Sequence, residues 1–170
     1  SKEFLQNLIT NVICKVKVNN SCFASLLTPQ GKFLYEFIVV KHKNGYFLDC
    51  EKNIINELYE KILSYKLRSQ IEVLNLSNEF VVAAFSYAKY LELEGAKDLS
   101  GFTLKYREDP IFLDPRLKEL GGRLIINLEK LYLSLKKLNL KSENPEIYYD
   151  HSFNLGVPQL QTNKSVSYTH

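Results

Sequence analysis

Glu36 is the polar residue whose setting in the sequence most suggests ligand chemistry. It interrupts an almost wholly apolar run, residues 33–40. Side chains along a strand alternate between its two faces, so if Phe37 and Val39 face one way, Glu36 and Leu34 face the other. A carboxylate on so apolar a strand lies either on a solvated face or beside a ligand, and the residues alone leave both interpretations open.

The other residue types that carry chemistry follow no known catalytic or metal-binding pattern. The histidines and cysteines are His42, His151, His170, Cys14, Cys22 and Cys50. The cysteines lack CxxC spacing, and the chain contains no Gly-rich phosphate loop, HExxH or GxSxG motif. We therefore expect no metal site and no catalytic residue, and we interpret the cysteines as reduced thiols. A histidine–carboxylate pair assembled by the fold stays open.

Composition limits the class of protein. The chain has 170 residues, of which 45% are hydrophobic and 24% charged, so a disordered chain, a coiled coil and a collagen-like repeat are excluded. A net charge of +3 is too small to indicate nucleic-acid binding, and the Tyr148-Tyr149 stretch has acidic neighbours. The apolar runs are far shorter than the roughly 20 residues of a membrane span, and the opening residues do not resemble a signal peptide. We expect a cytoplasmic protein with no membrane or direct nucleic-acid partner.

Hydrophobic periodicity predicts an α+β fold of antiparallel sheets with flanking helices on one face. Strands are expected over residues 15–20, 22–27, 33–41, 46–50, 71–76, 80–87 and 124–126. Helices are expected over residues 2–9, 53–67, 128–138 and 144–155. Asn44-Gly45 predicts a type I′ hairpin turn, and Asn53 is expected to cap the helix that it begins. The polar sequence of residues 88–109 indicates a connection, and we therefore expect subdomains over 1–109 and 110–160. Residues 161–170 have no apolar periodicity and are expected to form a loose tail.

Five stretches, in order, resemble motifs of the YgfZ family of folate-binding proteins, which is related to the T-protein aminomethyltransferase of the glycine cleavage system. They are FLQNLITN (4–11), LTPQGK (27–32), LRS (67–69), LDPR (113–116) with Gly121 and Arg123, and LGVP (155–158). The resemblance implies the first two subdomains of a three-domain, T-protein-like ring. It also implies tetrahydrofolate as ligand, a role in iron–sulfur cluster assembly or repair with iron–sulfur assembly proteins as partners, and a mitochondrial matrix location in a eukaryote.

The same resemblance implies the folate-binding residues Phe23, Glu36 and Arg116. Counted from the Gly31 turn, Glu36 stands where T-proteins carry an aspartate beside the pterin, and Phe23 stands where they carry a pocket aromatic. A pterin needs a flat apolar wall and a few polar groups that fix its orientation. Core packing is at least an equal interpretation for Phe23, and the residues of Asp114-Pro115-Arg116 favour a structural turn with an Asp–Arg ion pair in the neighbourhood of Arg123.

Two departures from the family pattern bear on function. The family's KGCYxGQE segment is absent before the last residue, His170, and Ser152 stands where the family has an arginine. We therefore expect no bound metal, and either self-association or an uncovered apolar face near residues 153–157. An aminomethyltransferase and a scaffold without a ligand are the alternative functions.

Overall fold

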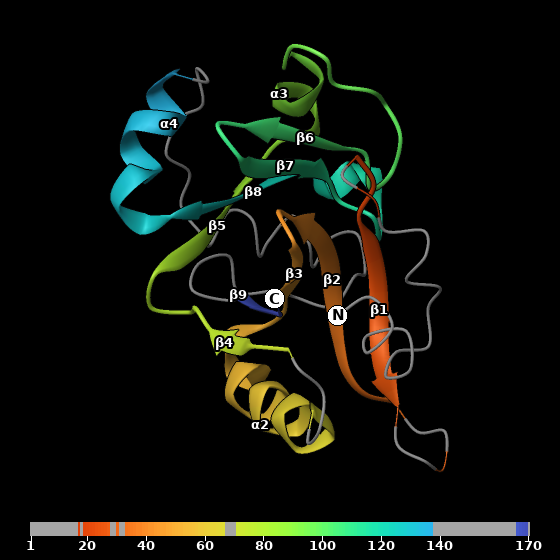
Figure 1. Ribbon diagram of the computed structural model, residues 1–170. Helices are drawn as coiled ribbons and strands as arrows, with labels where there is room; N and C mark the ends of the chain where they lie inside the picture. Colours follow the sequence, from red (N-terminus) through yellow and green to blue (C-terminus); the bar gives the residue numbers. More distant parts are fainter. Residues whose placement is uncertain are drawn as a thin grey trace.

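The computed structural model describes residues 17, 19–27, 30, 33–66, 71–137 and 166–169. Two antiparallel sheets pack face to face, and a helix covers the outer face of each sheet (Figure 1). The first sheet has the order β1-β2-β3-β9-β4, from β1 (Cys22–Leu27), β2 (Phe33–His42), β3 (Gly45–Asp49), β9 (Val166–Thr169) and β4 (Val73–Asn75). The second sheet has the order β5-β8-β7-β6, from β5 (Phe80–Phe85), β8 (Gly122–Asn127), β7 (Asp109–Leu113) and β6 (Thr103–Tyr106).

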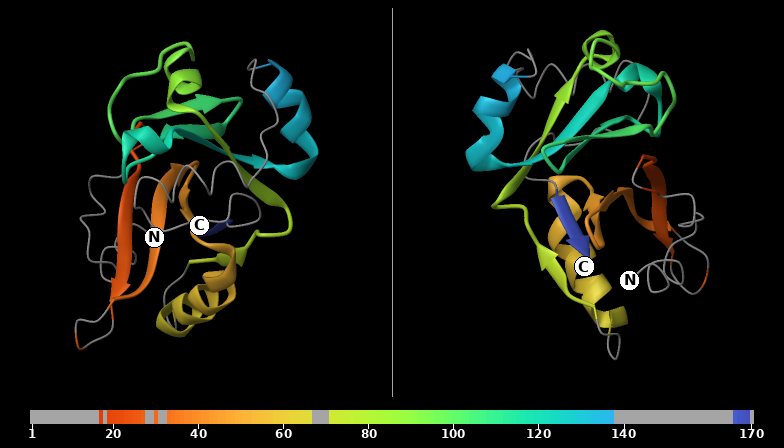
Figure 2. Two further views of the ribbon diagram at one scale, coloured as in Figure 1. Left: turned by 180° about the vertical axis from the view of Figure 1, so that it is seen from behind. Right: turned by 45° about the horizontal axis from the view of Figure 1, so that its top comes forward.

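The helices complete four layers. Helix α2 (Ile55–Lys66) packs on the first sheet, and the short helix α3 (Tyr87–Leu91) packs on the second (Figure 2). Helix α4 (Leu131–Lys137) follows β8. Single 3₁₀ turns precede α2, β8 and α4: η2 (Lys52–Ile54), η3 (Lys118–Leu120) and η4 (Leu128–Lys130).

Three apolar clusters hold these layers together. Ile55, Leu58 and Ile62 of α2 pack against one face of the first sheet. The facing sides of the two sheets share the second cluster, which includes Ile38 and Phe112. Tyr90 of α3 joins the third, on the outer face of the second sheet. Every residue of β3 and β7 is buried, and so are the first five residues of β8, because both faces of these strands are covered.

The expected antiparallel α+β class is confirmed, and so are the strands from residue 22 to residue 50 and the helix ending near residue 66. The helices lie on two outer faces, however, rather than on one. Asn53 does not cap α2, because it lies inside η2. The β2–β3 hairpin forms, but its left-handed residue is Lys43 (φ 51°), and Gly45 already pairs with His42.

The expected strand over 15–20 is wrong for its described part, since Lys17 and Asn20 pair with each other across a turn. The expected connection over 88–109 is wrong as well. It contains most of α3, all of β6 and the first residue of β7. The boundary expected after residue 109 therefore falls at the start of a strand, whereas the change from the first sheet to the second falls between β4 and β5.

Residues 166–169, expected within a loose tail, form β9 between β3 and β4. Their sequence, VSYT, is rich in the β-branched and aromatic residues that favour strands. The helices expected over 2–9 and 144–155, Cys14, His151, His170, Ser152 and the face near 153–157 lie outside the described residues. So do most or all of the residues of four of the five family-like stretches.

Candidate functional site

Charged side chains and one aromatic ring gather where the facing sides of the two sheets meet, and we call this group the inter-sheet site. The ring is that of Phe23, and the charged residues are Glu36, Asp49, Glu51, Asp114, Arg116 and Arg123. Directly opposite residues of antiparallel strands share a face. Phe23 of β1 pairs with Ile38 of β2, and Ile38 pairs with Asp49 of β3, so all three lie on the side that packs against the second sheet. Glu36 lies on the same side of β2, two residues before Ile38.

Asp49 and Arg123 form a buried ion pair between the sheets. The Arg123 Nε donates to Asp49 Oδ2 at 2.8 Å, and Arg123 Nη2 lies 2.7 Å from the same oxygen. Both side chains are 0% exposed. Burial raises the pKa of Asp49 and Arg123 opposes that rise, because the guanidinium stabilises the ionised carboxylate. This pair ties β3 of the first sheet to β8 of the second.

Asp114 and Arg116 form a second pair within the turn after β7. The Arg116 backbone N–H and Nε each donate to Asp114 Oδ1 at 2.9 Å, and Nη2 donates to Oδ2 at 2.5 Å. The side chains are 5% and 0% exposed for Arg116 and Asp114. The interpretation of this motif as a structural turn with an Asp–Arg ion pair agrees with these contacts, and the pair forms within the motif, between Asp114 and Arg116.

A close backbone approach fixes the segment between Arg116 and Arg123. Gly121 has a φ of 92°, and a Cβ on it would lie 2.2 Å from the carbonyl oxygen of Phe85. Its own carbonyl accepts a hydrogen bond from the Asp114 backbone N–H at 2.9 Å. Only glycine fits both the left-handed backbone and this approach. Gly121 therefore holds the Asp114 turn against the end of β5 and leads the chain into Arg123.

The structure brings two of the predicted ligand residues into contact. The Arg116 guanidinium carbon lies 6.0 Å from the centroid of the half-buried Phe23 ring, within range of a cation–π interaction. These residues are 93 positions apart in the sequence: Phe23 lies in β1 of the first sheet, and Arg116 lies in the turn after β7 of the second. Glu36 is exposed, and its charge acts on Glu51.

Glu51 is a site residue that the sequence reasoning missed. It lies two residues after the end of β3, is half-buried, and has a pKa raised first by burial and then by Glu36, with Arg116 opposing the rise. Asp49 was missed too. The signal that could have found both is the Asp-Cys-Glu run at the end of the apolar strand, because polar residues at a strand end commonly border a site.

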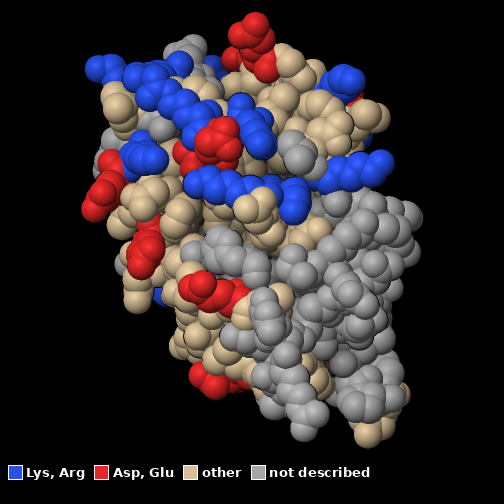
Figure 3. Space-filling view, in the orientation of Figure 1, with Lys and Arg blue, Asp and Glu red and all other residues tan. Residues whose placement is uncertain are grey.

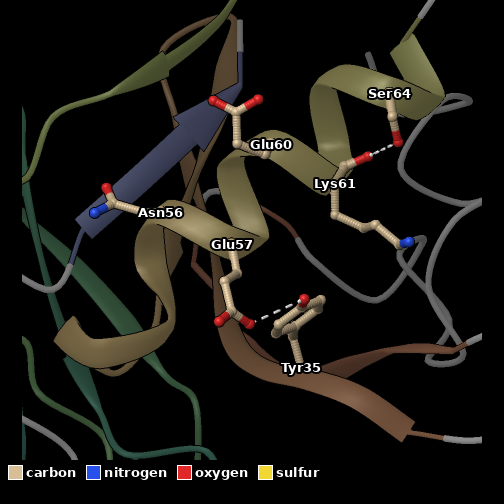
Figure 4. Close-up of a pocket in the computed structure, with 6 residues that line it drawn as sticks. All are labelled: Tyr35, Asn56, Glu57, Glu60, Lys61 and Ser64. Carbon is tan, nitrogen blue, oxygen red and sulfur yellow. Dashed lines mark hydrogen bonds between the residues drawn. The ribbon is translucent and has the colours of Figure 1, made fainter.

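A separate hollow of about 490 Å³ lies on the other side of the first sheet (Figure 4). Its lining residues are Tyr35, Asn56, Glu57, Glu60, Lys61 and Ser64. The Tyr35 hydroxyl donates to Glu57 Oε2 at 3.3 Å, and burial, together with the Glu57 carboxylate, raises the pKa of Tyr35. Since Tyr35 packs with the α2-facing cluster, this hollow is not part of the inter-sheet site.

Across the described residues, no group of three or more His, Cys, Asp or Glu side chains is arranged to hold a metal ion. A search of the same residues for a helix both long and apolar enough to cross a membrane finds none.

Comparison with known proteins gives two curated relatives. The chain is 24% identical over 183 residues to the "Iron-sulfur cluster assembly factor IBA57 homolog, mitochondrial" of Dictyostelium discoideum, with 91% of this chain and 44% of that protein covered. It is 24% identical over 169 residues to the protein of the same name from Neurospora crassa, with 95% and 38% covered. The chain thus spans less than half the length of these relatives. A scan against known protein families finds no match.

Proposed function

We propose that this chain binds tetrahydrofolate at the inter-sheet site and takes part in iron–sulfur cluster assembly. The assembly role is supported by the names of the two relatives, which cover more than nine-tenths of the chain. Both names also carry the word mitochondrial, so a mitochondrial location in a eukaryote is part of the proposal. Folate as the ligand is supported by the sequence resemblance and by the chemistry of the site.

The observation that carries the ligand proposal is the contact of Phe23 and Arg116 beside an excess of carboxylate. The site holds the carboxylates of Asp49, Asp114, Glu36 and Glu51 and the guanidinium groups of Arg116 and Arg123. Each arginine has a carboxylate partner, so the remaining negative charge belongs to Glu36 and Glu51.

A pterin ring suits this arrangement. Its flat surface can pack on an aromatic wall, and its ring N–H and amino groups donate hydrogen bonds that carboxylates accept. Glu36 and Glu51 are the acceptors that we assign to those donors. Arg116 is committed to Asp114, so its role is to hold the Phe23 wall in place rather than to bind the acidic tail of the folate.

Titration calorimetry with tetrahydrofolate tests the ligand. A hydrogen bond to a charged group contributes about 1.5–3 kcal/mol, so Glu36→Ala should weaken binding about tenfold or more. Glu57→Ala is the matched control, because Glu57 is also an exposed glutamate but lies on the α2 side of the same sheet. If wild type shows no heat of binding, or if both variants bind like wild type, the folate assignment fails.

The assembly role is tested separately in cells. The activity of an iron–sulfur enzyme should fall when the Dictyostelium relative is depleted, and this chain, expressed in the mitochondria, should restore part of it. Restoration by wild type but not by Glu36→Ala would link the role in iron–sulfur cluster assembly to ligand binding at Glu36. Full restoration by Glu36→Ala would separate assembly from ligand binding at this residue.

A further inference from the structure

Lys and Arg side chains gather on one half of the face shown in Figure 3, over the second sheet and α4. The described part of the other half carries mostly acidic and uncharged side chains. We define the basic surface by four residues from the tip of the β2–β3 hairpin, the β6–β7 hairpin and η4: Lys43, Lys105, Arg107 and Lys130. All four are exposed.

Asp109 connects these three elements. It is 8% exposed and pairs with Tyr106 across the β6–β7 hairpin, directly beside Arg107. Burial raises the pKa of Asp109, and the positive charges of Lys130 and Lys43 oppose that rise. Charges from the tip of the β2–β3 hairpin and from η4 thus act on one buried carboxylate at the end of the β6–β7 hairpin, where Glu108 acts in the opposite sense.

The backbone at the two hairpin tips gives a second, independent observation. Lys43 and Arg107 both have a φ of 51°, and Glu108 has a φ of 76°. In the part of the chain that the structure describes, these three are the non-glycine residues with a left-handed backbone. Glycine and asparagine adopt that conformation far more easily than lysine or arginine. Each hairpin thus keeps a cation at a left-handed tip position, and Glu108, the third such residue, lies 3.8 Å from Lys105.

An aromatic ring beneath one of the cations helps to identify the partner. The Arg107 guanidinium carbon lies 5.7 Å from the centroid of the Tyr106 ring, which is half-buried. Single-stranded nucleic acid binds by stacking bases on open aromatic rings in a basic groove. Here the Tyr106 ring is half-buried beneath Arg107, and Lys43 and Arg107 stand at hairpin turns, so the surface matches carboxylate side chains better than bases.

We propose that the basic surface docks an acidic segment of a partner protein. It is distinct from the inter-sheet site, because Lys43 and Glu36 are separated by seven residues of nearly continuous strand, roughly 20 Å. The proposal therefore does not depend on folate binding. Its occupant is defined by charge: a run of Asp or Glu residues that can reach both hairpin tips.

A charge-removing variant that also relaxes the backbone tests this directly. Lys43→Asn with Arg107→Asn removes two cations and places at both tips a residue that tolerates a left-handed backbone. The matched control is Lys52→Gln with Lys61→Gln, which removes the same charge from η2 and α2. The probe is a fluorescent poly-glutamate peptide of about 20 residues, followed by anisotropy at about 50 mM salt, where surface charge is weakly screened.

We expect the hairpin variant to bind the peptide about tenfold more weakly than wild type, while the control stays within about twofold. The thermal midpoint of the hairpin variant should equal or exceed that of wild type, which excludes misfolding as the cause. An equal loss of peptide affinity in both variants would mean that only the net charge of the protein matters, and it would overturn the proposal. If wild type binds oligo-dT of matched length, or vesicles containing phosphatidylserine, more tightly than it binds the peptide, the choice of occupant is overturned. If wild type does not bind the peptide at all, the docking surface itself is overturned.

Discussion

The buried Asp49–Arg123 pair allows the sharpest test of how the two sheets are joined. We consider Asp49→Asn, which preserves the size of the side chain and removes its charge. Both side chains are 0% exposed, and two nitrogens of Arg123 lie within 2.8 Å of Asp49 Oδ2. The guanidinium stays protonated at any pH at which the protein folds. The variant therefore leaves a buried positive charge without this carboxylate.

The expected cost follows from that charge. Breaking a buried ion pair on one side typically destabilises a protein by about 3–5 kcal/mol, because the partner stays desolvated and uncompensated. A domain of this size is stable by about 5–15 kcal/mol in total, so the variant should lose a large part of its stability. Replacing both partners, as Asp49→Leu with Arg123→Met, removes both charges and should cost far less than Asp49→Asn, or even stabilise the fold.

Urea unfolding followed by circular dichroism measures these differences. The control is Glu92→Gln, which breaks the exposed Lys89–Glu92 pair of 3.3 Å and should change stability by less than about 0.5 kcal/mol. A cost for Asp49→Asn no larger than that of the control would refute the reasoning, since it would mean that the pair is effectively hydrated. A double replacement as damaging as the single one would show that shape, not charge, dominates at this position.

Two further predictions concern the residues around the inter-sheet site. Gly121→Ala should destabilise the protein by about 2–4 kcal/mol in thermal unfolding, because the new Cβ would meet the Phe85 carbonyl at 2.2 Å at a φ of 92°. Gly95→Ala, with a similar φ of 80° but its nearest contact at 3.6 Å, should cost only about 1–2 kcal/mol of backbone strain, and equal losses would contradict the steric argument. Glu51→Gln should raise stability at pH 7, because burial and Glu36 raise the pKa of Glu51 above 4.5 and so disfavour its charged form in the fold. This gain should vanish as the pH falls below 4.5, where Glu51 is protonated in both the folded and the unfolded state, and a gain that persists at acid pH would show a cause other than charge.

The sequence predicted the parts of the fold whose signal is local. Strands β1 to β3 and helix α2 stand out as apolar runs and a helical stripe between turn residues. The β6–β7 hairpin was missed because its turn is Arg107-Glu108, with φ values of 51° and 76°, and not the glycine or asparagine that usually marks such a turn. Strand β9 was missed because its partners, β3 and β4, lie far away in the sequence.

The candidate site shows the same division. Glu36 was noticed because a carboxylate in an apolar run is conspicuous, whereas Phe23 and Arg116 came only from the family resemblance. Their 6.0 Å contact depends on how two sheets pack, and no local pattern reports that. Asp49 and Glu51 were overlooked because polar residues occur at strand ends for many reasons that have nothing to do with a functional site. The importance of Asp49 appears only when the facing strand supplies Arg123, and that of Glu51 only when the fold brings Glu36 and Arg116 near it.

The charges of the site divide into a structural set and a set available for binding. Asp49–Arg123 and Asp114–Arg116 are closed pairs with buried side chains, so a change in either pair should act first on stability. Glu36 is exposed and Glu51 half-buried, and neither is needed to neutralise an arginine that already has a carboxylate partner. A loss of ligand binding in Asp49→Asn could therefore arise through the fold alone. The same loss in Glu36→Ala, at unchanged stability, has to arise at the ligand, which is why Glu36 is the decisive residue for the proposed function.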